Sequence, residues 1–181
     1  QFPLQVIGIT GSNGKTTVKE MIASILRQAT AAGAAENNGS LDPVLATEGN
    51  LNNDIGVPQM LLRLRQHHRY AVIEMGMNHA GELAALTRLV RPHVALITTI
   101  AAAHIEFFDS TEAIADAKGE IFQGLEPGGT AIIPFDSPHR DRLFGHARPY
   151  AANILTFGIG DGADVRALEA IPNGNGTMVT V

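Results

Sequence analysis

The sequence contains no cysteine, which excludes disulfide bonds and thiolate metal sites. It also lacks any apolar run near the roughly 20 residues that a membrane-spanning helix needs, so we expect no membrane span. No signal peptide is expected either, because no basic stretch precedes Val6–Ile9 and that apolar run is too short. These absences favour a cytoplasmic protein.

Basic residues are scarce. The chain has 13 Lys and Arg against 18 Asp and Glu, a net charge of −5, and only three lysines, at positions 15, 19 and 118. This balance argues against nucleic acid as a partner. Hydrophobic residues make up 45% of the 181 residues, enough to form the core of one domain. We therefore expect a single domain over residues 1–181. We also expect the protein to be a monomer.

Apolar runs typical of buried parallel strands alternate with segments of helical spacing. The expected strands are Leu4–Ile9, Tyr70–Met75, Val94–Ile100, Thr130–Pro134 and Ile154–Phe157. The expected helices are Thr16–Gln28, Pro58–Arg65, Ala80–Val90, a helix capped by Ser110 that runs to about Gly124, and Pro138–His146; Ala29–Pro43 and Gly49–Gly56 are expected to be loops. This alternation predicts a doubly wound α/β domain with a mostly parallel sheet.

The last part of the chain has a different pattern. From Val165 onward short strand-like segments surround an Asn-Gly turn, at Asn173–Gly174 or Asn175–Gly176. We expect a short antiparallel β appendix at the C-terminus.

A glycine-rich segment, Gly8–Thr17, lies between the first expected strand and the first expected helix, which is the context of a phosphate-binding loop (P-loop). The helix start offers N–H groups and partial positive charge to an anion. Lys15 can reach the β- and γ-phosphates, and the Thr16 hydroxyl can ligate Mg²⁺. The expected phosphate-binding residues are Gly11, Ser12, Asn13, Gly14, Lys15, Thr16 and Thr17. The general pattern has glycine where this chain has Ile9, so a glycine-rich turn without a ligand is the alternative.

The form Thr-Gly-x-Asn-Gly-Lys-Thr-Thr, at Thr10–Thr17, resembles the loop of the Mur ligase family, including its departure from the general pattern. Four further segments match the family in order. They are Gly49–Pro58 (GNLNNDIGVP), Glu74–Glu82 (EMGMNHAGE), Ala101–Glu106 (AAAHIE) and Ala117–Phe122 (AKGEIF). The first two look most like the family member that adds D-alanyl-D-alanine, and the resemblance covers roughly residues 5 to 135.

The resemblance implies an ATP-dependent ligase that uses ATP and Mg²⁺. It would join D-Ala-D-Ala to UDP-N-acetylmuramoyl-tripeptide through an acyl phosphate. It also implies that the chain is the central ATP-binding domain, a fragment without the N-terminal UDP-binding and C-terminal domains of the family. The alternatives are a ligase similar to folylpolyglutamate synthase and a module that binds ATP without catalysis.

Two residues follow expected strands at the edge where ligands bind in open parallel sheets. Glu74 lies near the end of Tyr70–Met75, and His104 lies just beyond Val94–Ile100. The resemblance implies that both bind a second Mg²⁺. From the residues alone, Glu74 is equally an ordinary surface charge, and His104 is more often a structural residue. His79 stays undecided between a helix cap and a site residue.

Lys118 falls within the apolar stripe formed by Ile114, Ile121, Phe122 and Leu125. A lysine on a buried face must find a partner, shift its pKa or lose its charge. The resemblance implies that Lys118, Lys15 and His104 are catalytic. In several relatives the lysine that matches Lys118 is carbamylated and holds Mg²⁺. The alternative is a lysine whose amine extends to the rim of the helix.

Three asparagines, Asn50, Asn52 and Asn53, lie together in the expected loop Gly49–Gly56. The resemblance implies that this loop faces the UDP-sugar-peptide substrate. The alternative for each residue is a turn that its side chain stabilises.

Overall fold

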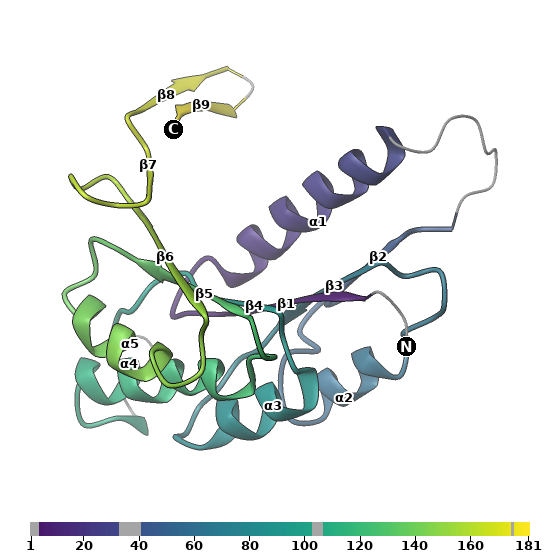
Figure 1. The fold of residues 1–181 in the computed structure, drawn as a ribbon, viewed down its shortest axis with the longest axis horizontal. Coiled ribbons are helices and arrows are strands. Elements are labelled where there is room, and N and C mark those ends of the chain that lie inside the picture. Colours follow the sequence, from purple (N-terminus) through teal and green to yellow (C-terminus); the bar gives the residue numbers. More distant parts are fainter. Residues whose placement is uncertain (1–3, 33–40, 103–106, 175) are drawn as a thin grey trace.

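A computed structural model describes residues 4–32, 41–102, 107–174 and 176–181. Its centre is a seven-stranded sheet in the order β2-β3-β1-β4-β5-β6-β7, in which every pairing is parallel (Figure 1). The strands are β1 (Gln5–Thr10), β2 (Val44–Ala46), β3 (Tyr70–Glu74), β4 (Val94–Ile97), β5 (Thr130–Pro134), β6 (Asn153–Gly158) and β7 (Val165–Arg166). The expected doubly wound parallel sheet is confirmed.

Helices cover both faces of the sheet (Figure 1). One face carries α1 (Lys15–Ala32). The other carries α2 (Gly56–Leu61), α3 (Glu82–Val90), α4 (Thr111–Gly119), the 3₁₀ helix η2 (Glu120–Gly124) and α5 (Arg140–Ala147). Ser110 caps α4 as expected, because its hydroxyl accepts a hydrogen bond from the Ala113 N–H at 3.1 Å.

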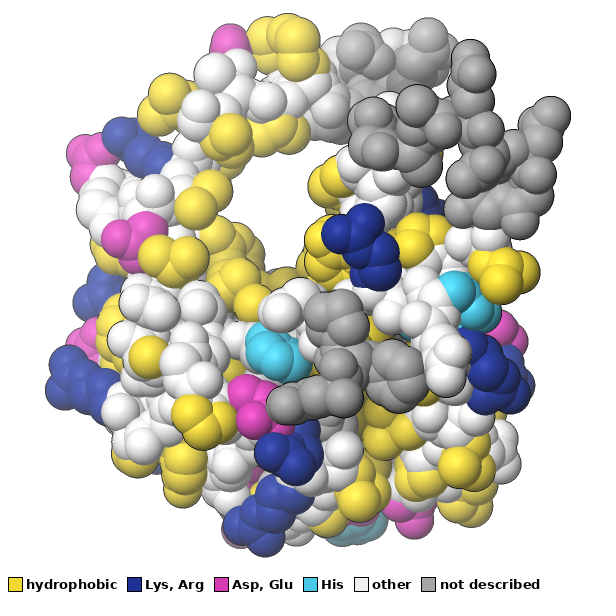
Figure 2. Space-filling model, turned by 45° about the vertical axis from the view of Figure 1, so that its right-hand side comes forward, with side chains coloured by type: hydrophobic (Ala, Val, Ile, Leu, Met, Phe, Trp, Pro, Cys, Tyr) yellow, Lys and Arg dark blue, Asp and Glu magenta, His cyan; other side chains and the backbone are white. Residues whose placement is uncertain are grey.

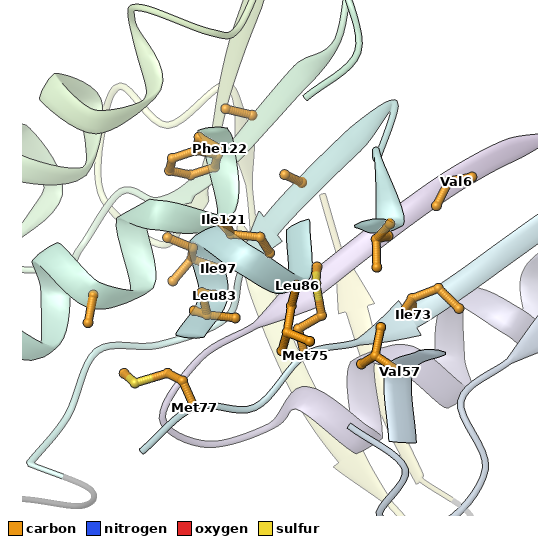
Figure 3. Packing of buried hydrophobic residues seen from close by; sticks show 14 of the residues in the cluster. Val6, Val57, Ile73, Met75, Met77, Leu83, Leu86, Ile97, Ile121 and Phe122 are labelled. Carbon is orange, nitrogen blue, oxygen red and sulfur yellow. The ribbon is translucent and has the colours of Figure 1, made fainter. Parts of the chain in front are cut away.

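The sheet divides the apolar side chains into two cores. The larger core lies under α2 to α5 and includes Ile73, Leu83, Ile97 and Phe122 (Figure 3). The smaller core lies under α1 and includes Val72. Val72 and Ile73 are neighbours in β3 and face opposite cores, because successive side chains of a strand alternate between its two faces. A strand buried on both faces explains the continuous apolar run in the sequence.

The expected antiparallel appendix is confirmed as the hairpin of β8 (Glu169–Asn173) and β9 (Gly176–Thr180), closed by the pair Asn173 and Gly176. The hairpin stands away from the sheet (Figure 1), and hydrophobic side chains on its surface face open space (Figure 2). Those exposed on the hairpin and beside it are Leu168, Ile171, Met178, Val179 and Val181. No helix in the described ranges is both long and apolar enough to cross a membrane.

The structure differs from the expected elements in several places. Helix α1 continues to Ala32 instead of ending at Gln28, because the alanines that follow favour a helix. Helix α2 ends at Leu61 and not at Arg65, and single turns follow it. Strand β2 was not expected, because three residues carry too little pattern. Strand β7 extends the main sheet instead of joining the appendix.

Close packing between η2 and α3 gives a test of the fold. A Cβ added at Gly124 would lie 2.2 Å from the backbone oxygen of Thr87 in α3. Gly124→Ala is therefore expected to lower the free energy of unfolding by about 1–3 kcal/mol. The control is Gly145→Ala in α5, where a Cβ meets nothing within 4 Å and alanine should stabilise the helix by roughly 0.5–1 kcal/mol. Urea unfolding measures both, and equal effects of the two substitutions would contradict the packing.

Candidate functional site

The glycine-rich loop leaves the carboxyl end of β1, between the ends of β3 and β4. Gly11 has φ +150°, and a Cβ there would lie 1.9 Å from the Thr98 hydroxyl oxygen. Close approach to the end of β4 therefore requires glycine. At Gly14 a Cβ would meet no atom within 4 Å, but the φ of +81° is left-handed, so the backbone conformation favours glycine there.

Ser12 and Asn13 bind the segment that follows β4. The Ser12 N–H donates to the Thr99 carbonyl at 2.8 Å, and the Ser12 hydroxyl pairs with the backbone of Ala101 at 3.0 Å. The Asn13 N–H donates to the Thr99 hydroxyl at 3.1 Å. These contacts hold the loop against β4. The Ser12 side chain is buried and serves as an anchor, and phosphate binding by these two residues stays a prediction.

Lys15, Thr16 and Thr17 form the first turn of α1, whose first N–H groups have no partner within the helix. The Lys15 Nζ donates to the Gly11 carbonyl at 2.9 Å, so the side chain lies across the loop. The Thr16 hydroxyl donates to Glu74 Oε2 at 2.9 Å. The Thr17 side chain is exposed. The loop and the expected metal-binding carboxylate are thus joined through one threonine.

Glu74 is the last residue of β3 and is only 2% exposed. Its Oε1 accepts from the Asn52 amide at 2.8 Å, and its Oε2 accepts from Thr16. Its own N–H donates to the Thr47 hydroxyl at 2.9 Å. The alternative of a surface charge was therefore wrong. A carboxylate buried among neutral donors is costly unless a cation compensates its charge.

The donors around Glu74 are oxygen and amide groups. Within the described residues no group of three or more His, Cys, Asp or Glu forms a metal cluster. Mg²⁺ needs no such cluster, because it is commonly held by one or two protein oxygens, phosphate oxygens and water. The Glu74 carboxylate beside the Thr16 hydroxyl therefore fits Mg²⁺. His104, which was expected to take part, lies outside the described residues.

Lys118 lies in α4 and is 2% exposed, so the alternative of an amine that extends to the rim was wrong. Burial lowers the pKa of Lys118 to about 8, and the positive charge of Lys15 adds to the lowering. Part of the Lys118 population therefore carries a neutral, nucleophilic amine near neutral pH. The positive charges of Lys15 and Lys118 are therefore close enough to repel each other.

The three expected substrate-binding asparagines have different positions. Asn50 is exposed, and all three line a cleft of about 500 Å³ beside Lys15. Asn52 contacts Glu74. The Asn53 side-chain oxygen accepts from the Gly56 N–H at 2.8 Å and from the Ile55 N–H at 3.2 Å, which stabilises the turn before α2. Asn53 thus has the local role that the alternative described, and substrate binding by the three stays a prediction.

His79 lies at the helix start, where its Nδ1 is 2.9 Å from Glu82 Oε1 and its ring packs on Phe107. The Glu120 carboxylate accepts from the Gly81 N–H at 2.7 Å and so satisfies the start of α3. The contacts of His79 and of Glu120 are thus explained by the structure at the start of α3. Lys19 and Thr47 also lie next to the site and were not predicted from the sequence. The helical spacing of Lys19 to Ile22 and Leu26 was the available signal for the burial of Lys19.

Comparison with known proteins gives matches over nearly the whole chain. The profile of the Mur ligase middle domain matches residues 9–181. The UDP-N-acetylmuramoyl-tripeptide--D-alanyl-D-alanine ligase of Haemophilus influenzae is 51% identical over 137 residues, which are 76% of this chain and 28% of that protein. The chain therefore spans less than a third of the length of that relative.

Solved structures of ligases also match this chain. A crystal structure of MurF from Acinetobacter baumannii superimposes with a TM-score of 0.81 at 40% identity, over 98% of this chain and 38% of that one. MurF from Thermotoga maritima, crystallised in complex with ADP, gives a TM-score of 0.79 at 30% identity, with the same coverage of 98% and 38%.

The buried amine of Lys118 predicts a dependence of stability on pH. The pKa of about 8 in the folded chain lies below the ordinary value of 10.5, so between these values the unfolded chain binds more protons. The free energy of unfolding should then rise with pH across this window, by up to roughly 3 kcal/mol. Lys118→Met should lose this rise. Urea titrations in CO₂-free buffer measure it, and the same pH dependence in both proteins would contradict the assignment.

Proposed function

The chain belongs to the Mur ligase family, and on that premise we propose that it is the ATP-binding domain of a ligase that joins D-alanyl-D-alanine to UDP-N-acetylmuramoyl-tripeptide. One observation carries the proposal: the Thr16 hydroxyl of the phosphate loop donates to the buried carboxylate of Glu74. An anion-binding loop and a cation-binding carboxylate in direct contact are what a nucleotide with its metal requires.

The reaction has two steps. A carboxylate oxygen of the tripeptide attacks the γ-phosphorus of ATP, the bond to the bridging oxygen breaks, and ADP leaves with an acyl phosphate as the other product. The amine of D-Ala-D-Ala then attacks the acyl carbon through a tetrahedral intermediate, and phosphate leaves while the nitrogen loses a proton. Neither step needs a protein nucleophile, so the protein contributes positioning and charge stabilisation.

Lys15 would leave its contact with the Gly11 carbonyl and hold the β- and γ-phosphate oxygens. The N–H groups of Gly14 to Thr17 at the start of α1 would hold the same phosphates, whereas the N–H groups of Ser12 and Asn13 donate to Thr99. Mg²⁺ would be held by Thr16 and Glu74, with His104 as a further ligand, and when bound it would neutralise charge on the phosphates. The bound Mg²⁺ would then compensate the negative charge of the buried Glu74 carboxylate.

Lys118 would act as a carbamate. The ammonium first loses a proton, and the neutral amine then attacks CO₂. A carbon–nitrogen bond forms while one carbon–oxygen π bond of CO₂ opens, and the nitrogen releases a second proton. The two losses together convert a cation into a carboxylate. The lowered pKa leaves roughly a tenth of this amine neutral at pH 7, far more than an ordinary lysine offers. A carboxylate at this position could hold Mg²⁺, and it would also remove the repulsion between Lys118 and Lys15.

The cleft lined by Asn50, Asn52 and Asn53 would receive the peptide end of the UDP-linked substrate. We propose that other domains of a longer protein complete the site, because the relatives that carry this activity in their names are more than twice as long as this chain. The 51% identity to a ligase named for UDP-N-acetylmuramoyl-tripeptide favours the UDP-linked tripeptide over folate as the carboxylate substrate. Phosphate release that depends on an amine acceptor would exclude a module that only binds ATP.

Replacing the loop lysine tests nucleotide use. Lys15→Ala should lower kcat/KM for ATP in the full-length ligase by about 100-fold or more, because one preorganised charge on the transferred phosphoryl group is lost. Arg166→Ala removes the same charge on distant β7 and should leave turnover unchanged. Coupled phosphate-release kinetics measure both, and near-normal turnover in Lys15→Ala would refute the phosphate loop.

The carbamate has its own test. Lys118→Ala should be inactive, and formate or acetate should restore part of the activity by placing a carboxylate in the vacated space. Lys118→Met is the control, because its side chain refills that space and should prevent rescue. ¹³C NMR with labelled CO₂ should show a carbamate signal in the wild type alone. An inactive Lys118→Ala without rescue, together with no carbamate signal in the wild type, would leave Lys118 as a plain buried amine.

A further inference from the structure

Lys19 is a buried lysine to which the proposed reaction gives no role. It is 1% exposed and lies in α1. Its Nζ donates to the Thr47 carbonyl at 2.6 Å and pairs with Glu20 Oε1 at 2.9 Å. The Glu20 side chain is 61% exposed, so its contribution is screened by solvent. Thr47 is therefore the partner that holds this amine inside the protein, where an amine without partners would be costly.

The contacts of Lys19 lead to Glu74. Lys19 lies three residues after Thr16, so both side chains project from the same face of α1. Thr16 donates to the Glu74 carboxylate, and Lys19 donates to Thr47, whose hydroxyl accepts from the Glu74 N–H. Helix α1 thus holds Glu74 in two ways. Thr16 binds the Glu74 carboxylate directly, and Lys19 binds Thr47, which in turn binds the Glu74 backbone.

Thr47 is also the point where the chain leaves the sheet. It directly follows β2, and its N–H donates to the Val72 carbonyl at 3.0 Å, as if the strand continued. Its own carbonyl accepts from Lys19. The chain then enters the loop whose Asn52 donates to Glu74 Oε1. The hydrogen bond from Lys19 therefore fixes Thr47, where the segment that leads to Asn52 begins. Asn52 is the second partner of the Glu74 carboxylate.

We propose that Lys19 is a positioning residue that, through Thr47, sets the Glu74 carboxylate and the Asn52 loop for the metal of the site. The proposal rests on the proposed function, because it takes Glu74 as the metal-binding carboxylate. Lys19 itself touches neither metal nor nucleotide. Residues that orient a metal ligand commonly change metal affinity by 10- to 100-fold when they are replaced.

The test is Mn²⁺ binding to the full-length ligase in the presence of a non-hydrolysable ATP analogue, measured by electron paramagnetic resonance. Lys19→Met, which keeps the volume and removes the amine, should weaken Mn²⁺ binding by about 10-fold or more. Analogue binding without metal should not change, and high Mg²⁺ should restore kcat. Thr47→Val should show the same defect, and the double variant should be no worse than either single one, because both act along one chain of contacts.

Two controls separate positioning from stability. Glu20→Gln removes the exposed partner of Lys19 and should leave Mn²⁺ affinity unchanged. Val6→Ala opens a cavity at the amino end of β1, the end of that strand opposite the phosphate loop, and should lower stability without altering Mn²⁺ affinity. Should Lys19→Met fold poorly, Thr47→Val carries the test with Lys19 in place. Normal metal affinity in the variants would overturn the role of Lys19. Absence of Mn²⁺ binding in the wild type would instead refute the proposed function.

Discussion

The site depends on one buried charge, the Glu74 carboxylate at the carboxyl end of β3. Its oxygens are bound by Thr16 from the phosphate loop and by Asn52 from the asparagine-rich loop, so it links two segments that are distant in sequence. Both donors are neutral and leave the negative charge without compensation. The Mg²⁺ that we propose for this site would compensate that charge.

The order of the strands puts these groups at one edge. Strand β1 lies between β3 and β4, and the chain changes direction across the sheet at β1, which is where open α/β sheets bind ligands. The phosphate loop follows β1, Glu74 ends β3, and the segment after β4 anchors Ser12 and Asn13. Gly11 permits this close approach, since any side chain there would meet Thr98. Packing against β4 and the proposed phosphate binding thus constrain the same short segment.

Much of this arrangement could be predicted from the sequence, because long apolar runs and a strand–loop–helix motif are local signals. The burial of Lys118 followed from helical spacing alone. Helical spacing could have indicated the burial of Lys19. Strand β2 and the contact of Lys19 with Thr47 could not be predicted, since they arise from a pairing with β3 that no local pattern reveals. The turn role of Asn53 was one of two alternatives that composition left equal. His104 lies outside the described residues, so its expected role as a ligand stays a prediction.

The most direct test is a crystal structure of the full-length ligase with a non-hydrolysable ATP analogue and Mg²⁺. The account predicts phosphates against the N–H groups of Gly14 to Thr17 at the start of α1, Lys15 turned from the Gly11 carbonyl to the phosphates, and an oxygen of Glu74 directed to the metal. A nucleotide bound elsewhere, or a Glu74 carboxylate that keeps only its contacts with Thr16 and Asn52 while metal binds at another place, would contradict it.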